Sequence, residues 1–205
     1  MESIIRDAIA QHLERHQLLK SSQHRFMSGK STLSNLLEYL EDLTKLVDQG
    51  HSVDILYLDF AKAFDKVPHV RLLKKCEGLG IRGSILAWIQ EWLTERRQRV
   101  VLNVKCSGWK EIVSGIPQGS VLGPTLFLVF INDIDVSAEV IGVIIKKFAE
   151  DTKYYMVVET EEEKKRFQAI LDNLAGWSCV WQMAFNIDKC HILHAGKRNE
   201  DTMYE

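Results

Sequence analysis

The 205-residue sequence has few of the features that mark disulfide-rich, disordered or membrane-spanning proteins. Its four cysteines form no Cys-x-x-Cys pair and no secretory signal peptide is recognisable at its start, so we expect reduced thiols inside the cell. Three prolines, twelve glycines and the lack of low-complexity sequence argue against disorder. No apolar run approaches the roughly 20 residues of a membrane helix. We therefore expect an intracellular protein, nuclear or cytoplasmic and not secreted, without a membrane partner.

The sequence also lacks a strong net charge. It has 26 Lys and Arg against 28 Asp and Glu, a formal net charge of −2, whereas nucleic-acid-binding domains are usually basic. The charge is uneven, because residues 1–110 hold 17 basic and 13 acidic side chains and residues 111–205 hold 9 and 15. This asymmetry is compatible with a cleft that has a positive wall and an acidic floor. Apolar residues make up 46%, enough for one domain with a sizeable core.

Apolar periodicity predicts a mixture of helices and strands. Leucines in residues 31–49 recur along one helical stripe, and residues 53–60 are apolar on both faces, as in a central strand. Thr160 and Glu163 form a capping-box pattern before a further helix. Predicted helices span 3–19, 31–49, 68–79, 83–95, 125–134 and 161–182, and predicted strands span 53–60, 97–105, 109–113, the runs on either side of 150–151, and 185–196, with a turn at 105–108.

Two adjacent acids, Glu150 and Asp151, stand between strand-like runs in KKFAEDTKYYMVV. The simplest interpretation is a surface hairpin, because Asp favours turns. Asp59 lies at the end of the predicted central strand, where a carboxylate must be exposed, paired or bound to a cation, and it is equally placed to cap a following helical turn. His191 and His194 lie three residues apart in a strand-like run, so they point to opposite faces and do not favour a shared metal.

Considered together, the three acids support a second interpretation. Strand ends that gathered Asp59, Glu150 and Asp151 would bring together charges that repel strongly. Two Mg²⁺ ions, or Mn²⁺ in their place, bound by carboxylates, waters and substrate phosphates would remove that conflict and support an in-line phosphoryl transfer. The sequence is therefore compatible with a nucleotidyltransferase, which the spacing alone does not establish.

The order of motifs resembles that of reverse transcriptases from non-long-terminal-repeat retrotransposons, close to the jockey-like group. The matching stretches are SSQHRFMSGKSTLSNLLEYLEDL, VDILYLDFAKAFDKVPH, RQRVVLNV, SGIPQGSVLGPTLFLVFINDI, KFAEDTKYY and WQMAFNIDKCHILHAGKRN, and they cover nearly the whole chain. The resemblance implies an α+β fold, the right-hand polymerase palm, in which helices back an antiparallel sheet. It also implies RNA-directed DNA polymerase activity, with an RNA template, a DNA primer and deoxynucleoside triphosphates as partners.

The resemblance further implies roles for individual residues. Asp59, Glu150 and Asp151 are expected to be catalytic and to hold the metal ions, and Lys189 resembles a lysine proposed to protonate pyrophosphate. The nucleotide-binding residues are expected to be Phe60, Phe64, Gln118 and Gly119. Of these, Phe64 occupies the place of a steric gate that excludes the ribose 2′-hydroxyl, and Gly119 lets the backbone approach a partner closely. Both phenylalanines have an alternative interpretation as core aromatics.

Several positions depart from the family pattern. The family's turn reads Phe-Ala-Asp-Asp, whereas this chain has Glu150 before Asp151. The extra methylene moves a carboxylate by roughly 1 Å, which is enough to cost about 10²-fold in rate, so we expect weakened or lost activity. Arg25, Met27 and Ser28 also differ from the family and predict a reduced contact with the template.

The resemblance divides the chain into a partial fingers region (1–52), a palm-rich region (53–199) and a truncated tail (200–205), and it leaves the thumb, the upstream fingers strands and an endonuclease domain missing. A non-catalytic remnant that binds nucleic acid or a protein is therefore the alternative function. SGKST (28–32) matches the end of a phosphate-binding P-loop, but His24 stands where that loop requires glycine.

Overall fold

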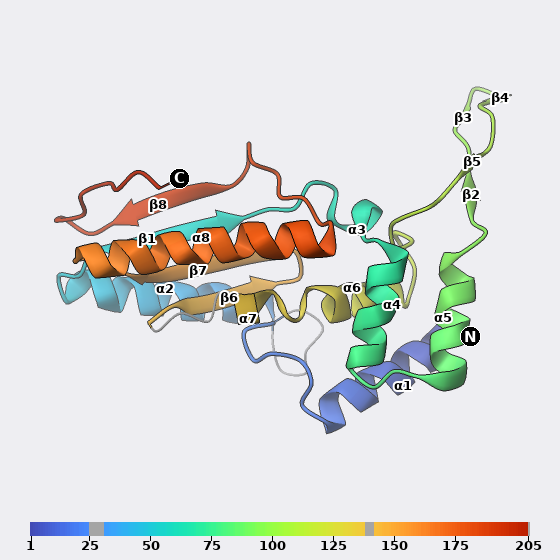
Figure 1. Ribbon diagram of the computed structural model, residues 1–205, viewed down its shortest axis with the longest axis horizontal. Coiled ribbons are helices and arrows are strands. Elements are labelled where there is room, and N and C mark those ends of the chain that lie inside the picture. Colours follow the sequence, from blue (N-terminus) through green and yellow to red (C-terminus); the bar gives the residue numbers. More distant parts are fainter. Residues whose placement is uncertain (25–30, 138–141, 205) are drawn as a thin grey trace. The chain divides into compact units, whose positions relative to one another are not determined.

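A computed structural model describes residues 1–24, 31–137 and 142–204 of the chain (Figure 1). The chain forms two compact units, each assembled from separate stretches of sequence. One unit comprises Met1–Leu18 and Lys62–Phe130, and the other comprises Leu19–Ala61 and Ile131–Glu205. The expected boundaries near residues 52 and 199 stay predictions, because these units are defined by spatial packing and not by continuous segments.

The second unit contains an antiparallel four-stranded sheet, which is the palm-like arrangement expected from the sequence. The strand order is β6-β7-β1-β8, so β1 is central, as its apolar character on both faces predicts. Every adjacent pair in this sheet is antiparallel. The strands are β1 (Val53–Leu58), β6 (Ile144–Phe148), β7 (Asp151–Val157) and β8 (His191–Ala195).

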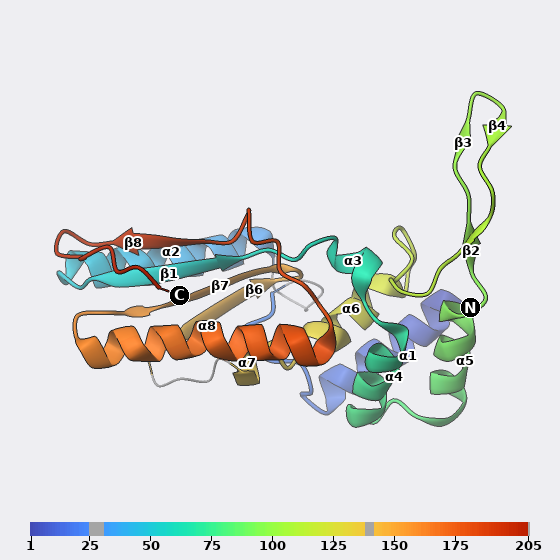
Figure 2. The same cartoon turned by 45° about the horizontal axis from the view of Figure 1, so that its top comes forward.

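Two helices cover the two faces of this sheet (Figure 2). Helix α2 (Thr32–Asp48) packs against the face that carries Val53 and Ile55, where Tyr39 and Tyr155 complete a buried cluster. The predicted leucine stripe of α2 is only partly used. Leu43 and Leu46 pack on this cluster, whereas the side chains nearer the start of the helix are 43–63% exposed, namely Leu33, Leu36, Leu37 and Leu40.

Helix α8 (Glu161–Trp181) lies across the opposite face (Figures 1 and 2). The predicted capping box is confirmed, since the Thr160 hydroxyl accepts from the backbone of Glu163 and the Glu163 carboxylate accepts from the backbone N–H of Thr160. The short helix α7 (Ile134–Ser137) packs beside it. The buried stripe of α8 consists of Phe167, Ile170, Leu174 and Trp177.

A fully buried carboxylate, Asp54, lies within the central strand on the α8 side. It accepts a hydrogen bond from Asn199 Nδ2 at 2.8 Å and another from the Tyr204 hydroxyl, and it lies 2.7 Å from Nδ1 of His194. The Tyr204 ring also contacts Phe167 of α8. Three partners from the last strand and the segment after it thus stabilise the charge, as a buried carboxylate requires.

The first unit is mostly helical. Pro68 precedes α4 and supports the predicted start of that helix, and the apolar run after residue 123 is confirmed as a helix. A single helical turn after Lys62 was not expected from periodicity, because it is too short to show any. The helices are α1 (Glu2–Arg15), α3 (Ala63–Lys66), α4 (His69–Gly78), α5 (Gly83–Leu93) and α6 (Gly123–Ile131).

A thin β-hairpin follows α5. The predicted turn at residues 105–108 is wrong, because Val101 pairs with Cys106 and Leu102 with Lys105, which places the turn at Asn103–Val104. Both turn residues have left-handed φ angles, +45° and +71°, as a two-residue type I′ turn requires. The paired segments are β2 (Arg97–Gln98) with β5 (Lys110–Glu111) and β3 (Val101–Leu102) with β4 (Lys105–Cys106).

Replacing Asp54 with alanine should destabilise the second unit by about 2–4 kcal/mol, because three half-buried polar groups lose their shared, fully buried acceptor. Urea unfolding followed by circular dichroism measures the change. Asp48→Ala, at the exposed end of α2, is the matched control and should change the free energy of unfolding by less than about 0.5 kcal/mol. Equal effects of the two substitutions would show that the buried network contributes little.

Replacing Val104 with glycine should stabilise the hairpin by about 1 kcal/mol, since a β-branched residue is strained at positive φ and glycine is not. Val104 is 96% exposed, so the substitution removes almost no packing. Amide hydrogen exchange across residues 99–109 should slow in this variant. Val100→Gly, between β2 and β3 where the Val100 carbonyl accepts from the Ser107 N–H at 2.9 Å, should speed exchange instead, and faster exchange in Val104→Gly would contradict the assigned turn.

Candidate nucleotidyl-transfer site

The two adjacent acids lie at a tight turn between β6 and β7. Phe148 pairs with Asp151, so Ala149 and Glu150 form a two-residue turn. Ala149 has a left-handed φ of +55°, and its backbone N–H donates to the Gln23 side chain at 3.1 Å. The hairpin interpretation is therefore confirmed, and it does not exclude the catalytic one. Asp151 is exposed at the start of β7 and Glu150 is half-buried.

The sheet brings Asp59 and Asp151 together. Leu58 pairs with Thr152 across β1 and β7, so the next residues along the two strands, Asp59 and Asp151, reach the same end of the sheet. Both line one pocket of about 380 Å³, whose wall also includes Tyr57 of the central strand. This juxtaposition is what the catalytic interpretation of the sequence requires.

Lys189 lies in the same pocket and pairs with the first of these acids. Its Nζ atom is 2.9 Å from Oδ2 of Asp59, and this pairing raises the pKa of Lys189, with a smaller contribution from the charge of Asp151. Asp59 therefore does not cap the helical turn that follows, whose N-cap is Lys62. The family resemblance predicted a catalytic role for Lys189 but did not indicate that Asp59 is its partner.

Two further lysines line the pocket from β6 and β7. Lys146 pairs with α2 through Glu38 at 2.7 Å and Asp42 at 3.5 Å. Lys153 lies over the ring of Tyr39, with Nζ 4.4 Å from the ring centroid, and burial lowers its pKa. The pocket therefore combines two aspartates with three ammonium groups, a balance suited to a ligand that carries negative charge of its own.

Glu150 does not join the two aspartates. Across the described residues, the structure gathers no three His, Cys, Asp or Glu side chains into a group able to hold a metal ion. The pocket walls include Asp59 and Asp151, and Glu150 is not among them. The structure thus brings Asp59 and Asp151 into one pocket, and the metal-binding role of Glu150 stays a prediction.

Lys147, in the strand that leads into the turn, is a buried charged residue that sequence reasoning missed. It is fully buried, its Nζ lies 2.7 Å from Asp135, and Asp135 also accepts a hydrogen bond from the Ser22 hydroxyl. Burial lowers the pKa of Lys147 and the Asp135 carboxylate opposes that change. The backbone N–H of Lys147 donates to the Ser22 carbonyl at 2.9 Å, so the residue fixes the strand that leads into the turn. Neither neighbour is visible from local sequence.

Phe60 lies in the core of the second unit. It is 3% exposed, its ring stacks on Phe185 with centroids 5.0 Å apart, and Trp177 lies 6.1 Å away. The alternative interpretation of Phe60 as a core aromatic matches this geometry. A nucleotide contact for Phe60 stays a prediction.

Three other predicted residues belong to the first unit. Phe64 stacks on Phe127 at 4.5 Å, and Gln118 donates to the Asp65 carboxylate at 2.9 Å. Gly119 has a φ of +79°, and a Cβ built there meets only open space. Glycine is therefore favoured at position 119 by its positive φ angle and not by a close neighbour in the chain. The space beside its Cα leaves room for a partner to approach the backbone.

Gly115 was missed by the sequence reading, although it lies in the same glycine-rich stretch. Its φ is +92°, and an added Cβ would lie 2.6 Å from the carbonyl oxygen of Asp65. Its N–H donates to the Val67 carbonyl at 2.8 Å, and its own carbonyl lies 2.8 Å from Nε2 of His69. Gly115 thus fixes the loop that carries Gln118 against the segment after Phe64.

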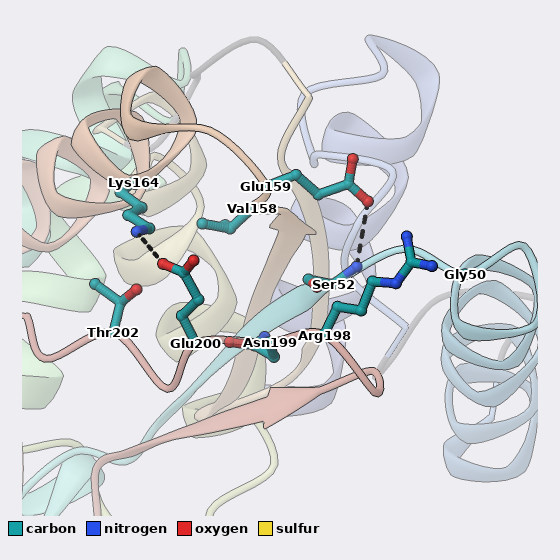
Figure 3. A pocket seen from close by; sticks show the side chains of 9 residues that line it. All are labelled: Gly50, Ser52, Val158, Glu159, Lys164, Arg198, Asn199, Glu200 and Thr202. Atoms are coloured by element: carbon teal, nitrogen blue, oxygen red, sulfur yellow. Dashed lines mark hydrogen bonds and ion pairs between the residues drawn. The ribbon is translucent and has the colours of Figure 1, made fainter.

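A second pocket, of about 260 Å³, lies at the other end of the sheet (Figure 3). Lys164 pairs with Glu200 at 2.7 Å, and Glu159 accepts from the backbone N–H of Ser52 at 3.4 Å. Ser52 precedes β1 and Asp59 follows it, so this pocket is separated from the aspartates by the length of the central strand. Its charged groups thus connect the segment after β8 to α8 and the residue before β1 to the segment after β7.

Two further predictions from the sequence concern residues that the structure does not describe. The departures at Arg25, Met27 and Ser28 and most of the P-loop-like stretch 28–32 lie outside the described residues. Over the parts of the chain that the structure describes, no helix combines the length and apolar character needed to cross a membrane.

Comparison with known sequences gives a consistent family assignment. The family model described as reverse transcriptase (RNA-dependent DNA polymerase) matches residues 2–203. The RNA-directed DNA polymerase from mobile element jockey of Drosophila funebris is 28% identical over 199 residues, and that of Drosophila melanogaster is 33% identical over 144 residues. These matches cover 93% and 65% of this chain but only 21% and 15% of those relatives, so the chain spans about a fifth or less of their length.

Solved structures share the fold. Telomerase from Candida tropicalis, truncated from its C-terminal domain, superposes with a TM-score of 0.71 at 13% identity and covers 95% of this chain and 41% of that one. The same enzyme in complex with a fragment of telomeric RNA gives a TM-score of 0.69 at 11% identity, with 99% and 35% covered. At such low identity the likeness concerns the fold alone.

Replacing Gly115 with alanine should displace the loop that holds Gln118, because the new methyl group collides with backbone at Asp65. We expect a loss of about 2–3 kcal/mol in the first unit, measured by urea unfolding. Gly119→Ala is the matched variant, since it bears the cost of positive φ without a collision, and it should lose only about 1 kcal/mol. A Gly119→Ala loss equal to or larger than that of Gly115→Ala would contradict the role of steric contact.

Proposed function

This chain belongs to the reverse transcriptase (RNA-dependent DNA polymerase) family, and we propose that it forms the palm of a retrotransposon polymerase that copies RNA into DNA. The observation that carries the proposal is the meeting of Asp59 and Asp151 at neighbouring strand ends in one pocket. A DNA primer, an RNA template and deoxynucleoside triphosphates are the partners. Because the chain spans only about a fifth of its curated relatives, the activity of the whole enzyme belongs to this proposal.

The donor set of the pocket fits a divalent cation. Asp59 and Asp151 supply two carboxylates, the ligand type that Mg²⁺ and Mn²⁺ prefer, and waters and substrate phosphates can complete the coordination. The ion pair between Lys189 and Asp59, at 2.9 Å, supports this assignment, because one of the two carboxylates is already paired with a positive charge. When bound there, the metal ions supply charge neutralisation at the attacking hydroxyl and at the leaving pyrophosphate.

The chain's own residues account for substrate positioning. Phe64, packed flat on Phe127, has the rigidity that a steric gate against the ribose 2′-hydroxyl needs. Gln118 and the open side of Gly119 provide a polar group and a close backbone approach for the incoming nucleotide and the template. Lys146, Lys153 and Lys189 attract the triphosphate to the pocket, and Lys189 is the candidate to protonate the departing pyrophosphate. Phe60 supports the site from the core.

Glu150 favours a second candidate function, a non-catalytic remnant that binds nucleic acid or a protein. The two aspartates lack a third carboxylate from the turn, and catalytic groups misplaced by about 1 Å can cost 10²-fold in rate. The chain keeps the core packing of a palm while its predicted third ligand is altered. Both functions use the same fold, so activity and binding have to be measured separately.

Primer extension on an RNA template tests the proposed function. Glu150→Asp should raise incorporation by about 10- to 100-fold, because the shorter side chain restores the position of the third carboxylate. Asp59→Ala should abolish incorporation in both backgrounds, and Asp48→Ala, on the exposed end of α2, is the control that should leave it unchanged. Salt-sensitive binding of nucleic acid without incorporation in any variant, including Glu150→Asp, would favour the remnant.

A further inference from the structure

Lys189 differs from an ordinary surface lysine in how its backbone is held. The turn that carries it is closed by hydrogen bonds from the N–H groups of Lys189 and Cys190 to the Asn186 carbonyl, at 3.0 and 2.9 Å. The side chain of Lys189 is 67% exposed, but the backbone that carries it is held by these two hydrogen bonds. A tethered ammonium group loses less freedom on pairing than one on a mobile loop.

The same turn holds the backbone of Asp59 from both sides. Asn186 donates its N–H to the Asp59 carbonyl at 2.8 Å, and the N–H of Asp59 points at the Cys190 sulfur at 3.5 Å. Two residues further on, the Ala61 N–H donates to the Ala184 carbonyl at 2.9 Å. Lys189 and Asp59 are thus joined by main-chain contacts as well as by their ion pair, so their pairing is built into the fold.

The ammonium groups of the other two lysines of the pocket contact side chains of α2. Lys146 pairs with Glu38 and Asp42 on α2, and Lys153 lies over the Tyr39 ring. Lys189 is the lysine of this pocket whose amine contacts Asp59, one of the two carboxylates that the proposed function assigns to cation binding. The electrostatic influence of Asp151 also reaches it.

We propose that Lys189 is a resident counter-ion of the Asp59–Asp151 pair, which a divalent cation must displace from Asp59 in order to bind. This inference rests on the proposed function, because it takes the two aspartates as the cation ligands. One ammonium offsets part of the repulsion between the carboxylates and thereby stabilises their close approach. The same ammonium occupies an oxygen that the cation needs, so it weakens cation binding. The turn keeps the displaced amine at the edge of the pocket, near the phosphates of a bound nucleotide.

Titration with Mn²⁺ alone, with free Mn²⁺ followed by electron paramagnetic resonance, tests the proposal without any requirement for turnover. Lys189→Met should bind Mn²⁺ about two- to fivefold more tightly than the unaltered chain, the range expected from removal of an exposed ion pair. Lys189→Arg keeps the charge and should bind like the unaltered chain. Lys189→Gln provides a second neutral variant, and circular dichroism checks that each variant is folded.

Lys146→Met is the matched control, because it removes one positive charge from the same pocket without removing a contact to Asp59. It should change the affinity for Mn²⁺ less than Lys189→Met does. Equal gains in the two variants would mean that only the overall charge of the pocket matters, and no gain or a loss in Lys189→Met and Lys189→Gln would overturn displacement. Either result contradicts the proposal.

The titration also separates failure of this inference from failure of the proposed function. Asp59→Asn and Asp151→Asn should each weaken Mn²⁺ binding at least tenfold if the two aspartates are the ligands. If both variants bind Mn²⁺ as the unaltered chain does, the ligand assignment is wrong, and the counter-ion proposal fails with it. If both weaken binding while Lys189→Met has no effect, the ligand assignment holds and only the role of Lys189 is refuted.

Discussion

The pairing of β1 with β7 is the constraint on which the candidate site depends. Leu58 lies opposite Thr152. Asp59, which follows Leu58, and Asp151, which precedes Thr152, therefore lie at the same end of the sheet. A shift of one residue would turn the side chains of β7 to the other face. Apolar burial against α2 on one side and α8 on the other opposes that shift. The geometry of the acids is therefore set by core packing and not by the acids themselves.

Local sequence was sufficient for the features that arise from periodicity and short-range hydrogen bonding. The central strand, most helices and the Thr160–Glu163 capping box follow directly from residue spacing. The hairpin turn was expected at residues 105–108, whereas the chain turns at Asn103 and Val104, which both adopt left-handed angles. Pairing across the hairpin outweighed the local preference of a β-branched residue.

In the candidate site, too, features set by local sequence were predictable and contacts between distant residues were not. Asp59 and Asp151 were predictable because a strand end fixes where each side chain lies. The absence of Glu150 from the lining of this pocket was not predictable, since a turn residue is not held by the strand pairing that places Asp59 and Asp151. Lys147 escaped notice because its partner, Asp135, comes from a distant helix. Contacts between residues far apart in sequence carry no local signal.

The buried carboxylate in the central strand has a consequence for the order in which the protein is made. Asp54 is synthesised before its partners His194, Asn199 and Tyr204, which follow 140–150 residues later. Until they emerge from the ribosome, a charge in the middle of the sheet has no protein donors, and burying it is costly. We therefore expect the sheet to close around β1 only after β8 and the segment that follows it have been made.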